Sequence, residues 1–300
     1  MSRTILVTGA TGRQGGAVIK ALQNTDFEIL ALTRSASSPS AQKLAKSSSN
    51  IKLVEGDLDD TEAVFRNAKA ATNNPIWGVY SVQAQVKGNV GVEETWGKNI
   101  IDSSIAAGVE FFVYSSVDRG GKKSSSTPTE VPHWITKHNL EKYLEAKAAG
   151  TQMKYTVLRP VAFMENVTND FAGKAMAATW NYALKDKPMQ LVATRDIGNF
   201  AAEAFKHPEE YSGRYLSIAG AELTYDQANA VFKEKIGMDM PRTFSLVACI
   251  GLIAVPAIGK MFNYLKKNAT GASIEESRKI YPGLLDFGTW LETESQFRKQ

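Results

Sequence analysis

The sequence contains a single cysteine, Cys249, in 300 residues. One thiol cannot form an internal disulfide framework, and an isolated cysteine is typical of proteins from a reducing compartment. The three histidines, His133, His138 and His207, show no spacing typical of metal ligands, so we predict no metal site. The chain opens on a strand pattern rather than on a secretory signal, and we therefore expect a cytoplasmic or nuclear protein.

A strong charge of either sign is also missing. Lys and Arg number 35 against 31 for Asp and Glu, and no basic run is longer than two residues. The concentrated positive patch of a protein that binds nucleic acid directly is therefore absent. Hydrophobic residues make up 43% of the chain, which is enough for a large buried core and excludes a disordered protein.

The sequence has no hydrophobic run long enough for a simple membrane span. One uncharged stretch, between Arg242 and Lys260, contains the apolar run Leu246–Ile258. A span needs roughly 20 mostly apolar residues, whereas this run is shorter and is interrupted by Gly251 and Pro256. We therefore expect a buried helix here and no membrane partner.

Short runs rich in β-branched and aromatic residues alternate with helical patterns through the first half of the chain. Six such runs predict six strands, and the alternation predicts a parallel sheet with right-handed crossovers. The predicted strands are Thr4–Thr8, Ile29–Thr33, Ile51–Val54, Trp77–Ser81, Phe111–Ser115 and Tyr155–Leu158. The predicted fold class is α/β, with a doubly wound, Rossmann-type sheet of strand order 3-2-1-4-5-6.

The intervening patterns predict helices, and the alternation weakens after Pro160. The predicted helices are Gly15–Gln23, Ala41–Ala45, Thr61–Ala68, Glu93–Ala107 and His133–Ala148, the third opening after a cap signal at Asp59-Asp60. We predict one domain over residues 1–160, completed by parts of 190–220, in which Val192–Ala193 and Tyr215–Ile218 are candidates to rejoin the sheet. Residues 161–190 and 221–300 are predicted to form a smaller, mostly helical domain for a substrate or partner.

The first strand runs directly into a glycine-rich turn, Gly9-Ala-Thr-Gly12-Arg-Gln-Gly15, and a helical pattern follows. Gly9 permits the tight turn, Gly12 lets the backbone approach a diphosphate, and Gly15 lets the helix pack against the strand. A glycine pattern alone is a weak signal. Its place after the first strand of an alternating pattern favours a dinucleotide site over a simple turn.

The second strand ends at Thr33-Arg34-Ser35, and Arg34 lies 19 residues beyond Gly15. NAD-specific sites usually carry Asp or Glu about 20 residues on, where the carboxylate accepts from the ribose 2′-hydroxyl. A guanidinium can instead hold the 2′-phosphate of NADP, which a carboxylate would repel. The sequence therefore predicts NADP(H) as the cofactor. Arg13, inside the turn, is either a second phosphate contact or a solvated surface residue.

Gly56-Asp57-Leu58 follows the third strand. The carboxylate of Asp57 could accept from the adenine amino group or could cap the helix that starts near Thr61. The sequence leaves both possibilities open.

These motifs together resemble the NmrA-like family over nearly the whole chain. The residues that carry the resemblance are the glycine turn, Arg34, Gly56–Leu58, Val113–Ser116, His133-x-x-x-Lys137-x-x-x-Glu141, Leu158–Asn166, Pro282–Leu284 and Phe287–Glu292. The resemblance implies an atypical short-chain dehydrogenase fold that binds NADP(H), in which some members are redox sensors that regulate a partner and others are reductases. It implies cofactor contacts by Gly9, Thr11, Gly12, Arg13, Gln14, Gly15, Arg34, Asp57, Leu58, Ser81 and Lys137.

The catalytic tyrosine of a working short-chain dehydrogenase is missing at the matching position, where this sequence has His133. Such an enzyme pairs that tyrosine with a lysine four residues on, and Lys137 keeps this spacing. His133 is a candidate general acid, because an ordinary imidazole titrates near a pH of about 6.5, or a structural residue at the helix start. Lys137 is a candidate to hold the nicotinamide ribose. Tyr143-x-x-x-Lys147 has the same spacing but lies deeper in the helix, and we predict a surface or packing role for it.

Ser115, Phe163 and Asn166 are predicted to line a substrate pocket. Ser115 and its neighbour Ser116 end the fifth strand at the edge where ligands bind, so either hydroxyl could polarise a substrate carbonyl or line the nicotinamide pocket. Phe163 and Asn166 follow the sixth strand and are candidates for the same pocket, although core packing would explain Phe163 equally well.

The missing tyrosine favours a redox-sensing regulator, in which NADP(H) binding changes the surface offered to a protein partner. The alternative is an NADPH-dependent reductase of a small carbonyl, imine or enone substrate. The expected partner is therefore a small-molecule substrate or a regulatory protein, with a homo-oligomer also open.

Overall fold

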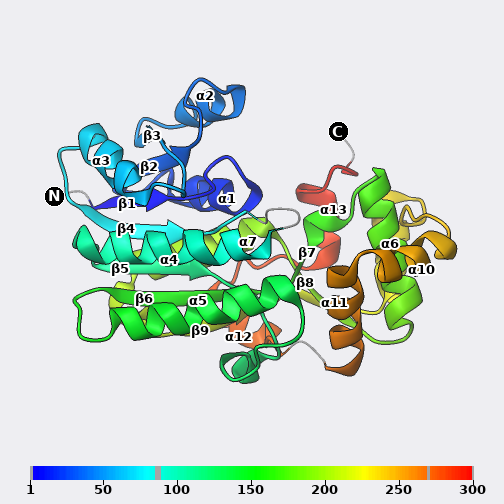
Figure 1. Cartoon of the computed structure of the whole chain (residues 1–300). Coiled ribbons are helices and arrows are strands. Elements are labelled where there is room, and N and C mark those ends of the chain that lie inside the picture. The colour runs from blue at the N-terminus through cyan, green and yellow to red at the C-terminus, as the bar shows by residue number, and fades with distance from the viewer. Residues whose placement is uncertain (1–2, 85–88, 269–270, 299–300) are drawn as a thin grey trace. The chain divides into compact units, whose positions relative to one another are not determined.

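The computed structural model describes residues 3–84, 89–268 and 271–298 (Figure 1). The chain divides into two compact units. Unit 1 comprises Met1–Ser116, Thr136–Arg159 and Ile197–Leu216, and unit 2 comprises Val117–Ile135, Pro160–Asp196 and Ser217–Gln300. The binding roles expected of the two predicted domains remain predictions.

Unit 1 is built on a parallel sheet of seven strands with the order β3-β2-β1-β4-β5-β6-β9. The strands are β1 (Thr4–Val7), β2 (Glu28–Thr33), β3 (Ile51–Glu55), β4 (Ile76–Ser81), β5 (Phe111–Ser115), β6 (Lys154–Pro160) and β9 (Tyr215–Ile218). The predicted order of the first six strands is confirmed. Tyr215–Ile218 joins the same sheet beside β6, as the sequence suggested.

Helices connect these strands along unit 1. They are α1 (Arg13–Leu22), α2 (Pro39–Ala45), α3 (Thr61–Ala71), α4 (Val90–Ala106), α5 (Pro132–Ala148), α7 (Thr194–Lys206) and α8 (Pro208–Tyr211). All five predicted helices are confirmed. Asp60 caps α3 by accepting from the Ala63 amide at 2.8 Å, as the Asp59-Asp60 signal predicted.

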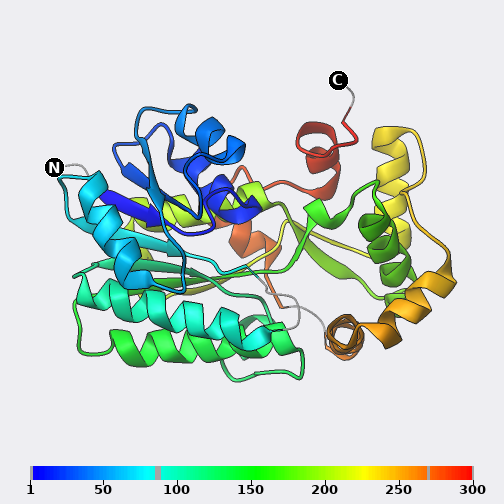
Figure 2. The ribbon, with the colours of Figure 1, turned by 45° about the horizontal axis from the view of Figure 1, so that its top comes forward.

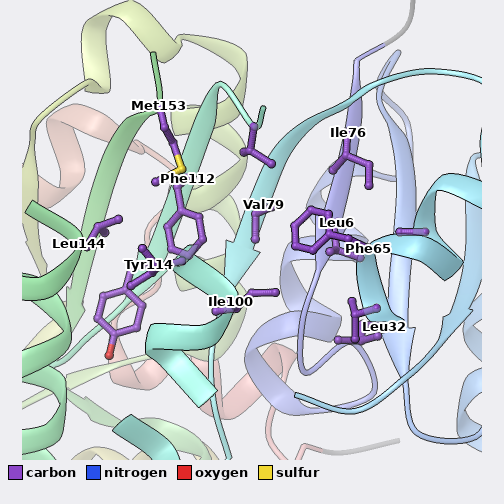
Figure 3. Packing of buried hydrophobic residues seen from close by; sticks show 14 of the residues in the cluster. Leu6, Leu32, Phe65, Ile76, Val79, Ile100, Phe112, Tyr114, Leu144 and Met153 are labelled. Atoms are coloured by element: carbon purple, nitrogen blue, oxygen red, sulfur yellow. The ribbon is translucent and has the colours of Figure 1, made fainter. Parts of the chain in front are cut away.

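One face of the sheet is covered by α3, α4 and α5. Figure 3 shows the buried side chains gathered there, among them Leu6, Val79 and Phe112 from the strands, Phe65 from α3, Ile100 from α4 and Leu144 from α5. In Figure 2, α4 and α5 are the blue-green and green helices that run side by side along this face. Alternate residues of a strand point to the same face, so Leu6 and its neighbours in register, Leu30 and Val79, contribute to one core.

The other face of the sheet is covered by α1 and α7. The Phe205 ring of α7 packs edge-on against Trp77 and Phe111, with centroids 6.3 and 5.9 Å away. Gly198 of α7 approaches Ala17 of α1 so closely that a Cβ at residue 198 would lie 2.4 Å from the Ala17 carbonyl carbon. Helices therefore cover both faces, which is the doubly wound arrangement predicted from the alternation.

Unit 2 combines a small sheet with helices. Its three strands, in the order β10-β8-β7, are β7 (Ala162–Phe163), β8 (Met189–Val192) and β10 (Ala221–Leu223). Its helices are α6 (Phe171–Leu184), α9 (Tyr225–Ile236), α10 (Ser245–Ala254), α11 (Pro256–Lys267), α12 (Ile274–Ile280) and α13 (Phe287–Thr293), with short 3-10 turns at Gly121–Ser125 and Met164–Asn166. The suggestion that Val192–Ala193 returns to the main sheet is wrong, because Val192 ends β8 and pairs with Phe163 of β7.

The expectation of a buried apolar helix over Leu246–Ile258 is also wrong. The run is broken into α10 and α11, which are bent by 107° relative to each other, and Ala248 alone is buried in α10. Several of its large apolar side chains are exposed instead. Within the described residues, no individual helix has the length and apolar character to cross a membrane, although α10 and α11 taken together pass that test despite their bend.

Candidate functional site

The glycine turn after β1 has the geometry that its spacing predicts. Gly9 has a φ of +59°, a left-handed conformation that favours glycine, and its carbonyl accepts from the Gly12 amide at 2.9 Å. At Gly15 a Cβ would lie 2.3 Å from the Gly9 carbonyl oxygen. The turn is therefore sterically reserved for glycine at both of these positions.

This turn delivers the start of α1 to solvent without a side-chain cap. The N-cap residue is Gly12, which provides no side-chain cap, and no acidic residue occupies the first turn of the helix. Thr11, Gly12 and Arg13 are exposed. Because backbone amides and the helix dipole at such an end favour an anion, the turn suits the diphosphate of a dinucleotide.

Arg34 lies exposed directly after β2, at the same sheet edge as the glycine turn. No carboxylate of the described chain forms an ion pair with it. The loop that follows is held by the Ala36 amide, which donates to Glu55 at 2.9 Å, and by Ser38, which caps α2. A guanidinium held on an ordered loop is suited to a phosphate, as predicted for the 2′-phosphate of NADP.

Asp57 and Leu58 follow β3, and both are partly buried. The cap alternative for Asp57 is wrong, because Asp60 caps α3. Asp57 instead accepts from the Asp59 amide at 3.1 Å, and Leu58 packs against the core of unit 1. The adenine contact predicted for Asp57 remains a prediction.

Gln14, in the first turn of α1, is joined to β5. Its side-chain oxygen accepts from the Ser115 hydroxyl at 2.6 Å and from the Tyr80 hydroxyl at 3.4 Å. Ser115 is fully buried, and burial raises the pKa of the Tyr80 phenol. The hydroxyl predicted for the substrate pocket is thus already bonded within the protein, and it ties the glycine turn to the end of β5.

Lys137 lies at the carboxyl end of β5. Its ammonium donates to the Ser115 carbonyl at 3.2 Å and lies 3.1 Å from a carboxylate oxygen of Glu93, which is buried. It also lies 5.7 Å from the centre of the Tyr114 ring. A lysine placed at this edge by a strand carbonyl and a buried carboxylate has little freedom to move.

A second buried ion pair lies beside it. Glu141 of α5 and Arg159 of β6 form two hydrogen bonds, of 3.0 and 2.6 Å, and the Ser116 hydroxyl donates to the same carboxylate. The two charged side chains are 1% and 2% exposed. Ser116 is therefore part of a structural network rather than a free hydroxyl.

Ser81, predicted to contact the cofactor, ends β4 and is almost fully buried. Its hydroxyl accepts from the side-chain amide of Gln83 at 2.7 Å. The predicted contact stays a prediction, and the observed role of the hydroxyl is to hold the residues that follow the strand.

The remaining predicted site residues lie in unit 2. His133 packs edge-on against Trp134, with ring centroids 5.9 Å apart. Phe163 is partly buried in β7, and Asn166 is exposed at the end of the turn that follows. His133 lies in the first turn of α5, four residues before Lys137, whereas Phe163 and Asn166 belong to other elements of unit 2. The predicted roles of all three in catalysis and substrate binding remain predictions.

The second tyrosine and lysine pair has the packing role predicted for it. The Tyr143 hydroxyl donates to Asp102 of α4 at 2.7 Å, and Lys147 lies 3.3 Å from the same carboxylate. Partial burial and the neighbouring Asp102 raise the pKa of Tyr143. This pair joins α4 to α5.

Glu93 is the residue at this edge that sequence reasoning missed. It lies in the first turn of α4, next to a second glutamate, Glu94, and no spacing in the sequence relates it to Lys137. The one signal that could have identified Glu93 was that it is a carboxylate on a helix expected to pack on the sheet. Among the described residues, no cluster of His, Cys, Asp and Glu could hold a metal ion.

The NmrA-like family matches this chain over residues 1–291, which confirms the resemblance predicted from the motifs. The NmrA-like family domain-containing oxidoreductase FrzB of a Cladobotryum species is 28% identical over 265 residues, covering 79% of this chain and 74% of the relative. The oxidoreductase cpsB of Aspergillus campestris is 30% identical over 262 residues, covering 80% and 75%.

Solved structures share the fold at lower identity. NmrA, a negative transcriptional regulator crystallised with NADP, matches with a TM-score of 0.71 at 16% identity, over 98% of this chain and 95% of that one. The NADPH-dependent quinone oxidoreductase QOR2 of Escherichia coli, complexed with NADPH, matches with a TM-score of 0.70 at 20% identity, over 95% and 97%. At these identities the likeness establishes the fold and nothing further.

Proposed function

We propose that this chain, which belongs to the NmrA-like family, is an NADPH-dependent reductase of a small carbonyl, imine or enone substrate. The observation that carries the proposal is the uncapped, glycine-lined start of α1 with an exposed Arg34 beside it at the same sheet edge. Relatives named as oxidoreductases, at 28% and 30% identity, support the same function.

The residues present fit an NADP dinucleotide. The backbone amides of Gly12 to Gly15 would hold the diphosphate. Glycine is needed at Gly15 because a Cβ there would collide with the Gly9 carbonyl oxygen and distort the turn. Arg34 would hold the 2′-phosphate, and Asp57 the adenine. The bound cofactor would supply the hydride that reduces the substrate.

Lys137 would then position the reactive end of the cofactor. Its ammonium is held by the Ser115 carbonyl and Glu93, and it retains a third N–H with which to donate to a ribose hydroxyl. Since the family tyrosine is replaced by His133, the proton that accompanies the hydride would come from His133 or from a substrate-bound water. Both possibilities arise because His133 stands where the family has its tyrosine.

A redox-sensing regulator is the second candidate, and the replaced tyrosine favours it. It has weaker support than the reductase. The regulator among the structures compared above is 16% identical to this chain, whereas the oxidoreductases reach about twice that identity.

The test is a panel of carbonyl, imine and enone substrates followed by NADPH absorbance, with wild type, Lys137→Met and Lys142→Met. Lys142 lies on the same helix and is half-exposed beside Glu145, so it is the matched control. Lys137→Met should lower kcat about 100-fold through lost positioning, with Lys142→Met near wild type.

Three results separate the candidates. Turnover that falls only in Lys137→Met supports the reductase, and equal losses in both variants contradict the role of Lys137. If no substrate is reduced while calorimetry shows clearly different affinities for NADPH and NADP⁺, the regulator replaces the reductase.

A further inference from the structure

The outward face of α10 carries a stripe of large apolar side chains in unit 2. Leu246, Ile250 and Ile253 recur at i, i+4 and i+7, so they lie on one side of the helix, and they are 70%, 55% and 78% exposed. Phe244, just before the helix, is 84% exposed. Ala248, on the opposite side, is buried where α10 packs on α6. The stripe is therefore turned away from the core of its own unit.

The segment that carries this stripe is uniformly basic. Residues 240–274 contain four cationic residues, Arg242, Lys260, Lys266 and Lys267, and no Asp or Glu, so this segment has a net charge of 4 − 0 = +4. The three lysines are exposed on α11, and no described carboxylate lies within ion-pairing distance of them. Their charges are available to an anionic surface.

A hollow of about 490 Å³ lies where α6, α10 and α11 meet. Leu252 and Phe262 supply apolar lining, while Lys185 and Lys266 supply cations. Asp186 follows Lys185 in the chain but does not line the hollow. Leu252 lies one turn after Ala248, so the hollow lies on the side of α10 away from the stripe and is a separate feature.

We propose that the apolar stripe, together with the exposed lysines of α11 that do not line the hollow, binds the surface of an anionic lipid bilayer. These residues are here called the basic apolar face (Phe244, Leu246, Ile250, Ile253, Lys260 and Lys267). The apolar stripe would enter the headgroup region while the lysines contact anionic headgroups. Binding is peripheral, since the bend of 107° between α10 and α11 rules out one straight span. The sequence argued against a membrane partner because it predicted a buried helix, and the exposure of the stripe removes that reason.

A second copy of this chain fits the face less well. Pairing the face with itself would bring its lysines against those of the partner copy without carboxylates to neutralise them. An anionic bilayer satisfies the apolar stripe and the lysines together. The charge of the segment therefore favours the bilayer.

The test is flotation of the full chain with phosphatidylcholine vesicles, either pure or containing about one third phosphatidylserine. The wild type should float with the anionic vesicles and much less with the neutral ones, and added salt should weaken binding. Leu246→Gln/Ile250→Gln/Ile253→Gln should lower partitioning about tenfold or more, because three exposed apolar side chains no longer enter the interface.

Lys260→Glu/Lys267→Glu should also lower partitioning more than about tenfold, at roughly fivefold for each lysine removed and more for charge reversal. Lys69→Glu/Lys154→Glu is the matched control, since it makes the same charge change at exposed sites of unit 1 and should float like wild type. Circular dichroism and the Tm of each variant verify folding, which changes at exposed side chains should leave intact.

Three outcomes overturn the proposal. The first is a wild type that does not float with anionic vesicles, and the second is a control that loses as much binding as the lysine variant. The third is a lipid-free dimer, seen by analytical ultracentrifugation, that the triple glutamine variant dissociates. That result would assign the face to a second copy of the chain.

Discussion

The carboxyl edge of the unit 1 sheet has two ends that differ in how far their polar groups are already partnered. At the open end, after β1 and β2, the start of α1 has no side-chain cap and Arg34 is exposed. At the closed end, after β5 and β6, Ser115, Ser116, Lys137, Glu141 and Arg159 are bonded to one another or to Gln14 and Glu93. The polar groups at the open end are exposed, whereas those at the closed end are bonded within the protein.

This difference separates residues expected to bind a cofactor from residues expected to stabilise the fold. Donors at the open end are solvated, so a bound anion replaces water and repays the exchange with charge-assisted hydrogen bonds. At the closed end, a ligand could bind only to an N–H group that is not already bonded, such as the third N–H of Lys137, or would have to break an existing hydrogen bond. Most closed-end residues should therefore affect stability, and the open-end residues should affect cofactor affinity.

The largest expected effect is the loss of the buried pair at the closed end. Glu141→Gln leaves the Arg159 guanidinium buried without its carboxylate, and we expect the free energy of unfolding to fall by about 3–5 kcal/mol. Urea denaturation measures this change. Glu145→Gln, half-exposed on the same helix, should change stability by less than about 1 kcal/mol.

A double variant sharpens the same comparison. Replacing both partners, as Glu141→Met/Arg159→Met, should be less destabilising than Glu141→Gln because no charge is left unpaired. If Glu141→Gln were as stable as wild type, the closed end would not be a structural network.

The open end could be predicted from the sequence because each of its features is local. Gly9, Gly12 and Gly15 act through backbone geometry within one turn, and Arg34 follows the second strand at a spacing that the fold fixes. The order of the strands followed from alternation and handedness for the same reason. Features that depend on residues close together in the chain can be recognised in a single sequence.

The closed end was less predictable because its bonds join residues far apart in the chain. Gln14 meets Ser115 across 101 positions, and Lys137 meets Glu93 across the packing of α4 and α5. Ser115 was predicted to polarise a substrate carbonyl or to line the nicotinamide pocket, whereas in the fold its hydroxyl donates to Gln14. The burial of α10 was mispredicted because hydrophobicity alone does not say whether an apolar helix faces a core or solvent.

The next effect is at the open end and tests cofactor choice. Arg34→Asp places a carboxylate beside the 2′-phosphate site, so the Kd for NADPH should rise about 100-fold while that for NADH changes little. Calorimetry with both cofactors measures this split. Arg66→Asp, on an exposed arginine of α3, is the control and should leave both affinities near wild type. Equal losses for NADPH and NADH would remove Arg34 from the phosphate role.

The smallest effect concerns Glu28, at the opposite edge of the sheet. Like Glu141, this carboxylate has several hydrogen-bond and ion-pair partners, but it is partly exposed. Glu28, at the start of β2, lies 2.6 Å from the Lys52 ammonium and accepts from Thr4, Thr72 and Asn74. Burial alone would raise the pKa of Glu28, but Lys52 and these hydrogen bonds outweigh it and lower the pKa from 4.5 to about 2.

Because the folded-state pKa of Glu28 lies below the ordinary value, its contribution is complete above pH 4.5 and is lost as the pH falls towards 2. Glu28→Gln should therefore lower the free energy of unfolding by about 2 kcal/mol at neutral pH, and the difference from wild type should shrink as the pH falls through that window. Urea denaturation at several pH values measures it. A difference that stayed constant down to the lowest pH would mean that Glu28 acts through shape rather than charge, unlike the ion pair at the closed end.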